Sequence, residues 1–192
     1  MRIISGTARS RQIATPEGKD TRPTLDRVRE NLFNILQNRI YSSYVLDLFA
    51  GSGALSLEAL SRGASFAIMC DIDRKANRVE KLNVERLGFS DRTEIYCCDW
   101  RTALKNLKSR GMKFDLVFLD PPYKMTDLRE VFDELEDLTV NDSIVTVEHE
   151  AKQSVLFGKG FVHQDERKWG FCGISFYGKK TDSNPEVQEV VQ

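Results

Sequence analysis

The sequence predicts an α/β fold: an open, mostly parallel sheet of about seven strands that ends in a C-terminal antiparallel hairpin. Two observations support this prediction. Between residues 44 and 148, short runs of strand-forming residues alternate with segments of helical apolar spacing, which is typical of parallel strands joined by crossover helices. After residue 160, two strand-like runs are joined only by a short glycine-containing loop, which predicts a hairpin.

The individual elements follow from local signals in chain order. Residues 9–13 and the turn-like residues 15–18 predict a short hairpin or loop, and residues 24–38 have the apolar spacing of an amphipathic helix. A strand at 44–49, a glycine turn at 50–53 and a helix at 54–61 make the first half of a βαβ unit. The remaining predicted strands are 66–70, 93–97, 114–119, 144–148, 160–167 and 173–178, and the remaining helices are 74–87, 102–109 and 128–138.

Composition excludes several classes of protein. The chain has 28 basic and 29 acidic residues and is 41% hydrophobic, which argues against general disorder and against collagen-like or mucin-like chains. It contains neither an apolar run of roughly 20 residues, as a membrane span requires, nor a secretory signal at its start. We expect a cytoplasmic monomer with three parts: an extension and helix at 1–40, an α/β domain at 41–180 and a flexible tail at 181–192.

Basic residues are concentrated near the N-terminus. Residues 1–40 hold eight basic and four acidic side chains, whereas residues 126–150 hold one and nine. Arg2, Arg9 and Arg11 lie in a stretch of fifteen residues without an acid. Such a basic extension can bind the phosphates of a nucleic acid, although charge alone is equally consistent with a solvated hairpin.

Cysteine and histidine provide little material for a metal site. The four cysteines form no CxxC pair, and the chain has only two histidines, which argues against zinc and against a histidine-based triad. We therefore expect no metal and expect each cysteine to be a small buried hydrophobic residue.

Acidic residues follow the predicted strands, where open α/β sheets bind their ligands. Gly51 and Gly53 allow a ligand to approach the backbone at the start of a helix. Asp71 follows Gly51 by 20 residues, the spacing at which a carboxylate binds ribose hydroxyls, so a nucleoside-containing cofactor is indicated. Ser56 occupies the third glycine position of the dinucleotide fingerprint, which makes NAD the weaker interpretation.

The most specific motif is Asp120-Pro121-Pro122-Tyr123, directly after the predicted strand 114–119. The two prolines stiffen the backbone and leave carbonyls available as acceptors. Asp120 and the Pro121 carbonyl can accept from an exocyclic amine while Tyr123 stacks on the ring that bears it. These four residues are our candidates for catalysis.

These motifs resemble those of S-adenosylmethionine-dependent amino-methyltransferases, which have a Rossmann-like sheet. The opening Met1 to Gly6 and the run Asp20 to Leu36 are more particular, and resemble bacterial methyltransferases that modify a guanine N2 in 16S ribosomal RNA. The resemblance covers roughly residues 1–178. It implies S-adenosylmethionine as cofactor and 16S ribosomal RNA or the small ribosomal subunit as partner.

The resemblance also implies roles for individual residues. Asp47, Gly51 and Gly53 would surround the methionine part of the cofactor, Asp71 would bind its ribose, and Asp99 with Trp100 would contact the adenine. Two neighbouring hydrophobic residues complete the implied cofactor site. Two residues of the segment 22–24, which would close over the active site, and one arginine after that segment join the arginines above as expected RNA contacts. These are Phe49 and Ile72 for the cofactor, and Arg22, Thr24 and Arg27 for the RNA.

The residues leave alternatives open. The motif at 120–123 also suits an adenine N6 in DNA or a protein glutamine, and the glycine turn alone suits a nucleotide-binding protein without methyl transfer. Only the N-terminal resemblance favours ribosomal RNA.

Overall fold

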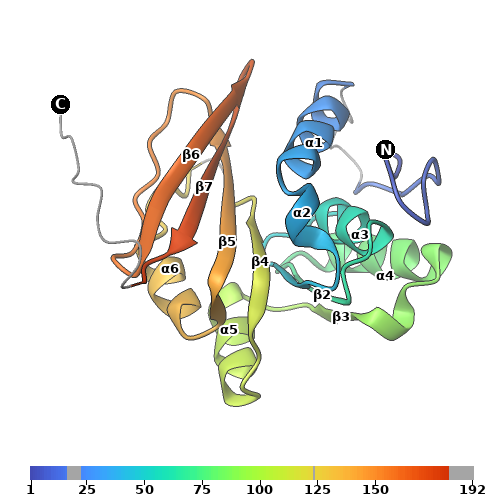
Figure 1. The fold of residues 1–192 in the computed structure, drawn as a ribbon. Helices are drawn as coiled ribbons and strands as arrows, with labels where there is room; N and C mark the ends of the chain where they lie inside the picture. The colour runs from blue at the N-terminus through green and yellow to red at the C-terminus, as the bar shows by residue number, and fades with distance from the viewer. Residues whose placement is uncertain (17–22, 123, 182–192) are drawn as a thin grey trace.

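The computed structural model describes residues 1–16, 23–122 and 124–181 of the chain (Figure 1). Within these ranges, seven strands form one sheet: β1 Tyr44–Asp47, β2 Phe66–Cys70, β3 Thr93–Tyr96, β4 Phe114–Leu119, β5 Thr139–Glu150, β6 Phe161–Trp169 and β7 Cys172–Lys179. The helices are α1 Pro23–Ile35, α2 Gln37–Ile40, α3 Ala54–Ser61, α4 Arg74–Leu87, α5 Trp100–Ser109 and α6 Arg129–Glu136, with a 3-10 turn at Ser90–Arg92.

The strand order is β3-β2-β1-β4-β5-β7-β6. Strands β1 to β5 run parallel to one another, and β7 pairs antiparallel with both β5 and β6. This confirms the predicted mostly parallel sheet and its C-terminal hairpin. The order reverses direction between β1 and β4, which is where ligands bind in open α/β sheets.

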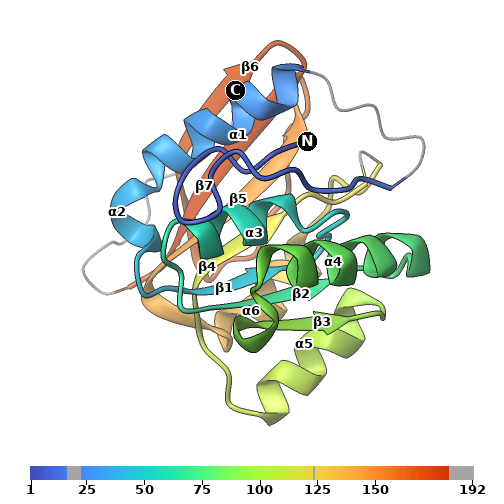
Figure 2. The same cartoon turned by 90° about the vertical axis from the view of Figure 1, so that its right-hand side faces the viewer.

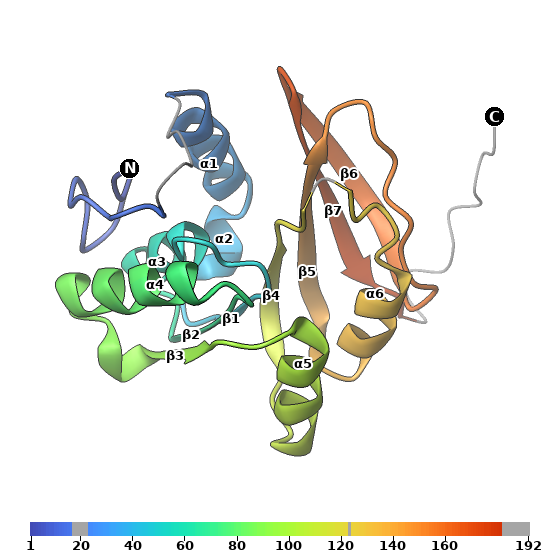
Figure 3. The same ribbon diagram turned by 180° about the vertical axis from the view of Figure 1, so that it is seen from behind.

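Helices cover both faces of the sheet. On one face, α1, α2, α3 and α4 pack on alternate strand residues such as Val45 and Phe118, and Figure 2 shows α1, α3 and α4 in front of the sheet. On the other face, α5 and α6 pack on the intervening residues, such as Leu46 and Leu119 (Figure 3). Because strand side chains alternate in direction, short apolar strands supply two cores at once.

The N-terminal segment folds back on the first of these cores. Its backbone forms a narrow ladder in which the Ile3 N–H donates to the Arg11 carbonyl at 3.0 Å. The buried Glu58 carboxylate of α3 accepts from the Ile4 and Ser5 N–H groups at 2.7 and 3.0 Å. Gly6 has a φ of +85°, and a Cβ there would lie 1.8 Å from the Ser61 carbonyl oxygen. The Met1–Gly6 run is thus held on α3.

Several element boundaries differ from the predictions. The predicted helix 24–38 breaks after Ile35, where hydrogen bonding tightens to the 3-10 type between the Arg39 N–H and the Leu36 carbonyl at 2.8 Å. The first strand ends at Asp47, because residues 48–49 form a turn. Strand β5 starts at Thr139, earlier than predicted. Thr139 pairs with Phe114 of β4, but the exposed residues 141–142 that follow it interrupt the apolar pattern from which a strand was predicted.

The predictions for the cysteines and the termini have mixed outcomes. Cys70 is buried as expected, but Cys97 is exposed because the chain leaves the sheet after Tyr96, so the expectation of four buried cysteines is wrong. In the N-terminal ladder, residues 11–13 pair with residues 1–3, while residues 17 and 18 of the predicted turn lie outside the described residues. Residues 182–192 of the expected tail also lie outside them.

Candidate active site

The glycine loop after β1 is held against the end of β2. Gly51 and Gly53 have φ values of +57° and +75°, which favour glycine. A Cβ at Gly53 would lie 2.5 Å from the Met69 sulfur, so only glycine allows this close approach. The Gly51 N–H donates to Asp71 Oδ2 at 2.9 Å. The 20-residue spacing noted in the sequence therefore corresponds to a direct contact.

Asp71 is half-buried at the carboxyl end of β2. Its other oxygen, Oδ1, accepts from the Asp73 N–H at 2.8 Å, and Asp73 in turn caps α4 by accepting from the Lys75 N–H at 2.8 Å. The carboxylate orientation is therefore fixed from two sides. Two oxygens held in this way can still accept from further hydroxyl groups, because each has two lone pairs.

Asp47 is the last residue of β1 and is only 1% exposed. The Ser56 hydroxyl donates to its Oδ2 at 3.1 Å, whereas its Oδ1 has no hydrogen-bond partner among the described residues. Burial raises the pKa of Asp47 to about 7, partly offset by the hydrogen bonds from Ser56. The site thus contains a buried carboxylate that a cationic group would stabilise in its charged form.

Two side chains of α4 support this region and were not singled out by the sequence. Glu80 is buried, accepts from the Asn77 amide at 3.1 Å, and has a pKa raised to about 8 by burial and then by the charges of Asp47 and Asp71. Asn83 donates to the Ser52 carbonyl at 3.0 Å and to the Ala14 carbonyl at 2.9 Å. It therefore ties the glycine loop to the N-terminal segment. In the sequence, these residues are recognisable only as members of a predicted helix, and helical spacing does not distinguish a buried polar residue from one on the surface.

The prolines follow β4 at the switch point of the sheet. Asp120 is exposed and Pro121 is buried. The Pro122 carbonyl accepts from the Met125 N–H at 2.7 Å and closes a turn, which uses one of its two lone pairs. Tyr123 lies outside the described residues. The amine-binding role of Asp120 and the Pro121 carbonyl remains a prediction.

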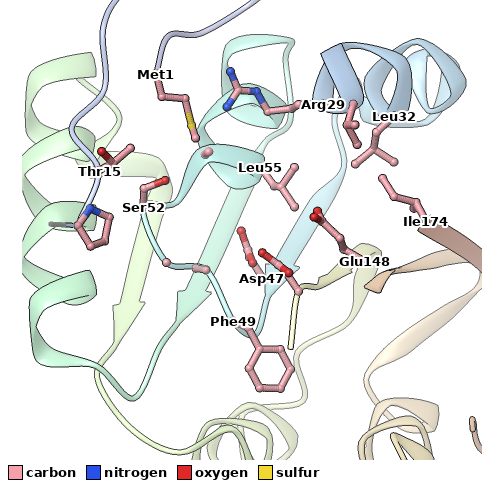
Figure 4. Close-up of a pocket in the computed structure, with 16 residues that line it drawn as sticks. Met1, Thr15, Arg29, Leu32, Asp47, Phe49, Ser52, Leu55, Glu148 and Ile174 are labelled. Carbon is pink, nitrogen blue, oxygen red and sulfur yellow. The ribbon is translucent and has the colours of Figure 1, made fainter. Parts of the chain in front are cut away.

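A pocket of about 150 Å³ joins these segments. Figure 4 shows Met1, Arg29 and Leu32 on one side and Phe49 on the other, with the carboxylates of Asp47 and Glu148 pointing into the space between them. Of the predicted site residues, the pocket brings together four from the ends of β1 and β4. They are Asp47, Phe49, Gly51 and Asp120.

The residues expected to bind the ribose and adenine lie at the neighbouring strand ends, outside this pocket lining. Ile72 is 71% exposed beside Asp71, and the Asp99 side chain caps α5 by accepting from the Arg101 N–H at 2.9 Å. Trp100 is 6% exposed and packs in the core, with the Arg101 guanidinium 4.2 Å from its ring centroid. Their contacts with a cofactor remain predictions.

The residues expected to bind RNA fall into different environments. Arg2, Arg9 and Arg27 are exposed. Arg11 donates from its guanidinium to the Arg86 and Leu87 carbonyls at the C-terminus of α4, so it holds the N-terminal segment in place. Arg22 lies outside the described residues, as does the side chain of Thr24.

Arg29 was not singled out by the sequence, although it lines the pocket. Its buried guanidinium donates to the Arg2 carbonyl and to Asp26 Oδ1 at 3.2 Å, and burial lowers its pKa. In the part of the chain that the structure describes, no group of three or more His, Cys, Asp or Glu side chains is arranged to hold a metal ion. No described helix is long and apolar enough to cross a membrane.

The strand order, the glycine loop and the acidic strand ends define a Rossmann-like methyltransferase. The solved structure of yhhF from Escherichia coli superposes on this chain with a TM-score of 0.79 at 33% identity, and covers 95% of this chain and 99% of that one.

The chain belongs to the family described as Conserved hypothetical protein 95, whose model matches residues 1–178. Ribosomal RNA small subunit methyltransferase D of Escherichia coli is 36% identical over 157 residues, which cover 81% of this chain and 77% of that protein. YlbH of Bacillus subtilis, whose name places it among rRNA methyltransferases, is 34% identical over 183 residues, covering 94% of this chain and all of that protein.

Proposed function

We propose that this protein transfers a methyl group from S-adenosylmethionine to the exocyclic N2 of a guanine in 16S ribosomal RNA of the small subunit. The observation that carries the proposal is the shared pocket, in which Asp120 of the Asp-Pro-Pro segment faces the same space as Asp47 and the glycine loop. The relatives named as small-subunit ribosomal RNA methyltransferases support the substrate class.

The residues at the ends of β1 and β2 suit this cofactor. Asp47 Oδ1 is a buried acceptor without a partner among the described residues, which matches the ammonium of the methionine part. Gly51 leaves the backbone accessible, and the Asp71 carboxylate beside it can accept from two ribose hydroxyls. When bound, the cofactor supplies a sulfonium methyl group that an amine lone pair can attack in line.

Asp120 and the Pro121 carbonyl would orient the guanine amine by accepting from its N–H groups, which directs the lone pair toward the methyl donor. Positioning of this kind supplies much of the rate enhancement in such transfers. As the N–C bond forms, the S–C bond would break and leave a neutral thioether, and the nitrogen would lose one proton to solvent. A guanine within a paired or stacked region cannot reach the pocket, so the nucleotide must be looped out or flipped.

Residues 1–40 would bind the RNA, and residues 41–180 would carry the catalytic machinery. The exposed Arg2, Arg9 and Arg27 can contact phosphates, which position an RNA without reading its sequence. Arg11 would contribute indirectly by fixing the segment on α4. We propose that the protein acts as a monomer in the cytoplasm, where small ribosomal subunits are assembled.

Transfer of a tritiated methyl group tests the function. Naked 16S RNA, assembled small subunits, DNA and total protein are offered in parallel, and labelled RNA is digested to nucleosides for identification. We expect label in one of the two RNA samples, as N2-methylguanosine. Label only in DNA or protein would contradict the proposal. That result would favour adenine N6 or a protein glutamine as the substrate, which the motif at residues 120–123 also suits.

A further inference from the structure

Glu148 places a second carboxylate beside Asp120. Strands β4 and β5 are parallel with Leu119 opposite Val147, so the next residues, Asp120 just after β4 and Glu148 within β5, lie side by side. Both line the pocket that contains Asp47, and Glu148 also lines a smaller hollow with Pro121. Figure 4 shows the Glu148 carboxylate turned into the pocket. The reaction described above gives Glu148 no role.

The surroundings of Glu148 keep this carboxylate in place. It is half-buried on β5, between β4 and β7 in the sheet. The Cys172 thiol of β7 donates to Glu148 Oε1 at 3.4 Å. Burial raises the pKa of Cys172, and the charges of Glu148 and then Asp120 raise it further, so the thiol stays protonated and able to donate.

We propose that Glu148 accepts the N1–H of the target base while Asp120 accepts from its N2 amine, so that this carboxylate pair selects guanine. The inference rests on the function proposed above. Guanine has donors at N1 and N2 on one edge, and two adjacent carboxylates match that pattern. Adenine and cytosine have an acceptor lone pair next to the amine. A carboxylate facing that lone pair repels it and is left without a hydrogen bond, which disfavours the wrong base.

The test uses an RNA substrate, naked or assembled, in which the methylated guanine is replaced by 2-aminopurine. This base keeps the amine at position 2 but has an acceptor at N1 instead of a donor. For the wild-type protein we expect kcat/KM to favour guanine by about 100-fold or more. Glu148→Gln can donate its amide to N1, so this preference should fall at least about tenfold.

Two further variants separate base selection from structural damage. Glu148→Asp keeps the charge and should retain the preference for guanine at a lower rate. Glu150→Gln changes an exposed carboxylate two residues along the same strand and should leave both rate and preference unchanged. Calorimetric titration with S-adenosylmethionine checks that each variant still binds the cofactor.

The outcomes distinguish this inference from the proposed function. If the wild type methylates the guanine RNA and Glu148→Gln discriminates as strongly as the wild type, the guanine-selecting role is overturned and the proposed function stands. If Glu148→Asp loses the preference together with Glu148→Gln, the carboxylate charge is not what selects the base, and the inference also fails. If the wild type methylates neither naked RNA nor assembled subunits, the proposed function itself fails.

Discussion

Replacing the buried Asp47 by Asn should stabilise the cofactor-free protein above about pH 7 and weaken cofactor binding. The pKa of Asp47 is raised from its ordinary 3.8 to about 7 because the carboxyl is buried. A difference of this size corresponds to about 4 kcal/mol against ionisation in the folded state. Asn accepts the Ser56 hydroxyl equally well, but its amide leaves buried donors that cost about 1–3 kcal/mol.

The pH dependence isolates the contribution of ionisation. Because its folded pKa is raised, Asp47 holds a proton that the unfolded chain releases between about pH 4 and pH 7. Wild-type stability therefore falls as pH rises through this window, whereas Asp47→Asn lacks this loss. We expect the free energy of unfolding of the variant, relative to wild type, to increase by about 2–4 kcal/mol between pH 4.5 and pH 8.

Urea unfolding of the cofactor-free proteins at several pH values measures this difference, with Asp142→Asn as the control at an exposed carboxylate. Calorimetric titration at pH 8 should show S-adenosylmethionine binding weakened by about 10- to 100-fold, since a charge-assisted hydrogen bond is lost. Parallel stability curves for variant and wild type would refute the raised pKa. Unchanged affinity would remove Asp47 from the cofactor site.

Two further predictions concern Asp120, which precedes the two prolines, and Gly6 of the N-terminal segment. Asp120→Ala should lower the rate of single-turnover methyl transfer at saturating cofactor by about 100-fold or more. The affinity for the cofactor, measured by calorimetry, should stay near that of the wild type. Full activity of the variant would contradict the amine-orienting role of Asp120. Gly6→Ala should lower the free energy of unfolding, measured by urea denaturation, by about 2–4 kcal/mol. The added Cβ would clash with the Ser61 carbonyl and force the N-terminal segment away from Glu58, which holds it. Gly111→Ala, at a φ of +66° with open space around it, should cost only about 1–2 kcal/mol, and an equal cost at both positions would contradict the clash.

The sequence by itself was sufficient for the order of the elements and for most of the strand-end motifs. Apolar periodicity and the positions of glycines are local properties, and they located α4 at the predicted residues 74–87, where the left-handed Gly88 ends the helix. Short sequence motifs were enough to single out Gly51 with Asp71 and Asp120 with Pro121 as candidates, because these residue types and their spacing indicate ligand binding directly. The start of β5 was missed, because the pairing of Thr139 with Phe114 is not visible in the sequence and the exposed polar residues 141–142 interrupt the strand pattern where the register shifts.

Only the tertiary structure decided which side chains share the pocket. Asp120 and Glu148 are 28 residues apart and become neighbours through the register of β4 and β5. Glu58 meets the Ile4 N–H across 54 residues, and the same packing converts Asp47 from an ordinary carboxyl into one with a pKa near 7. Strand register, burial and dielectric environment arise from contacts distant in sequence. Local patterns therefore identify the candidate residues but not their neighbours or their charge states.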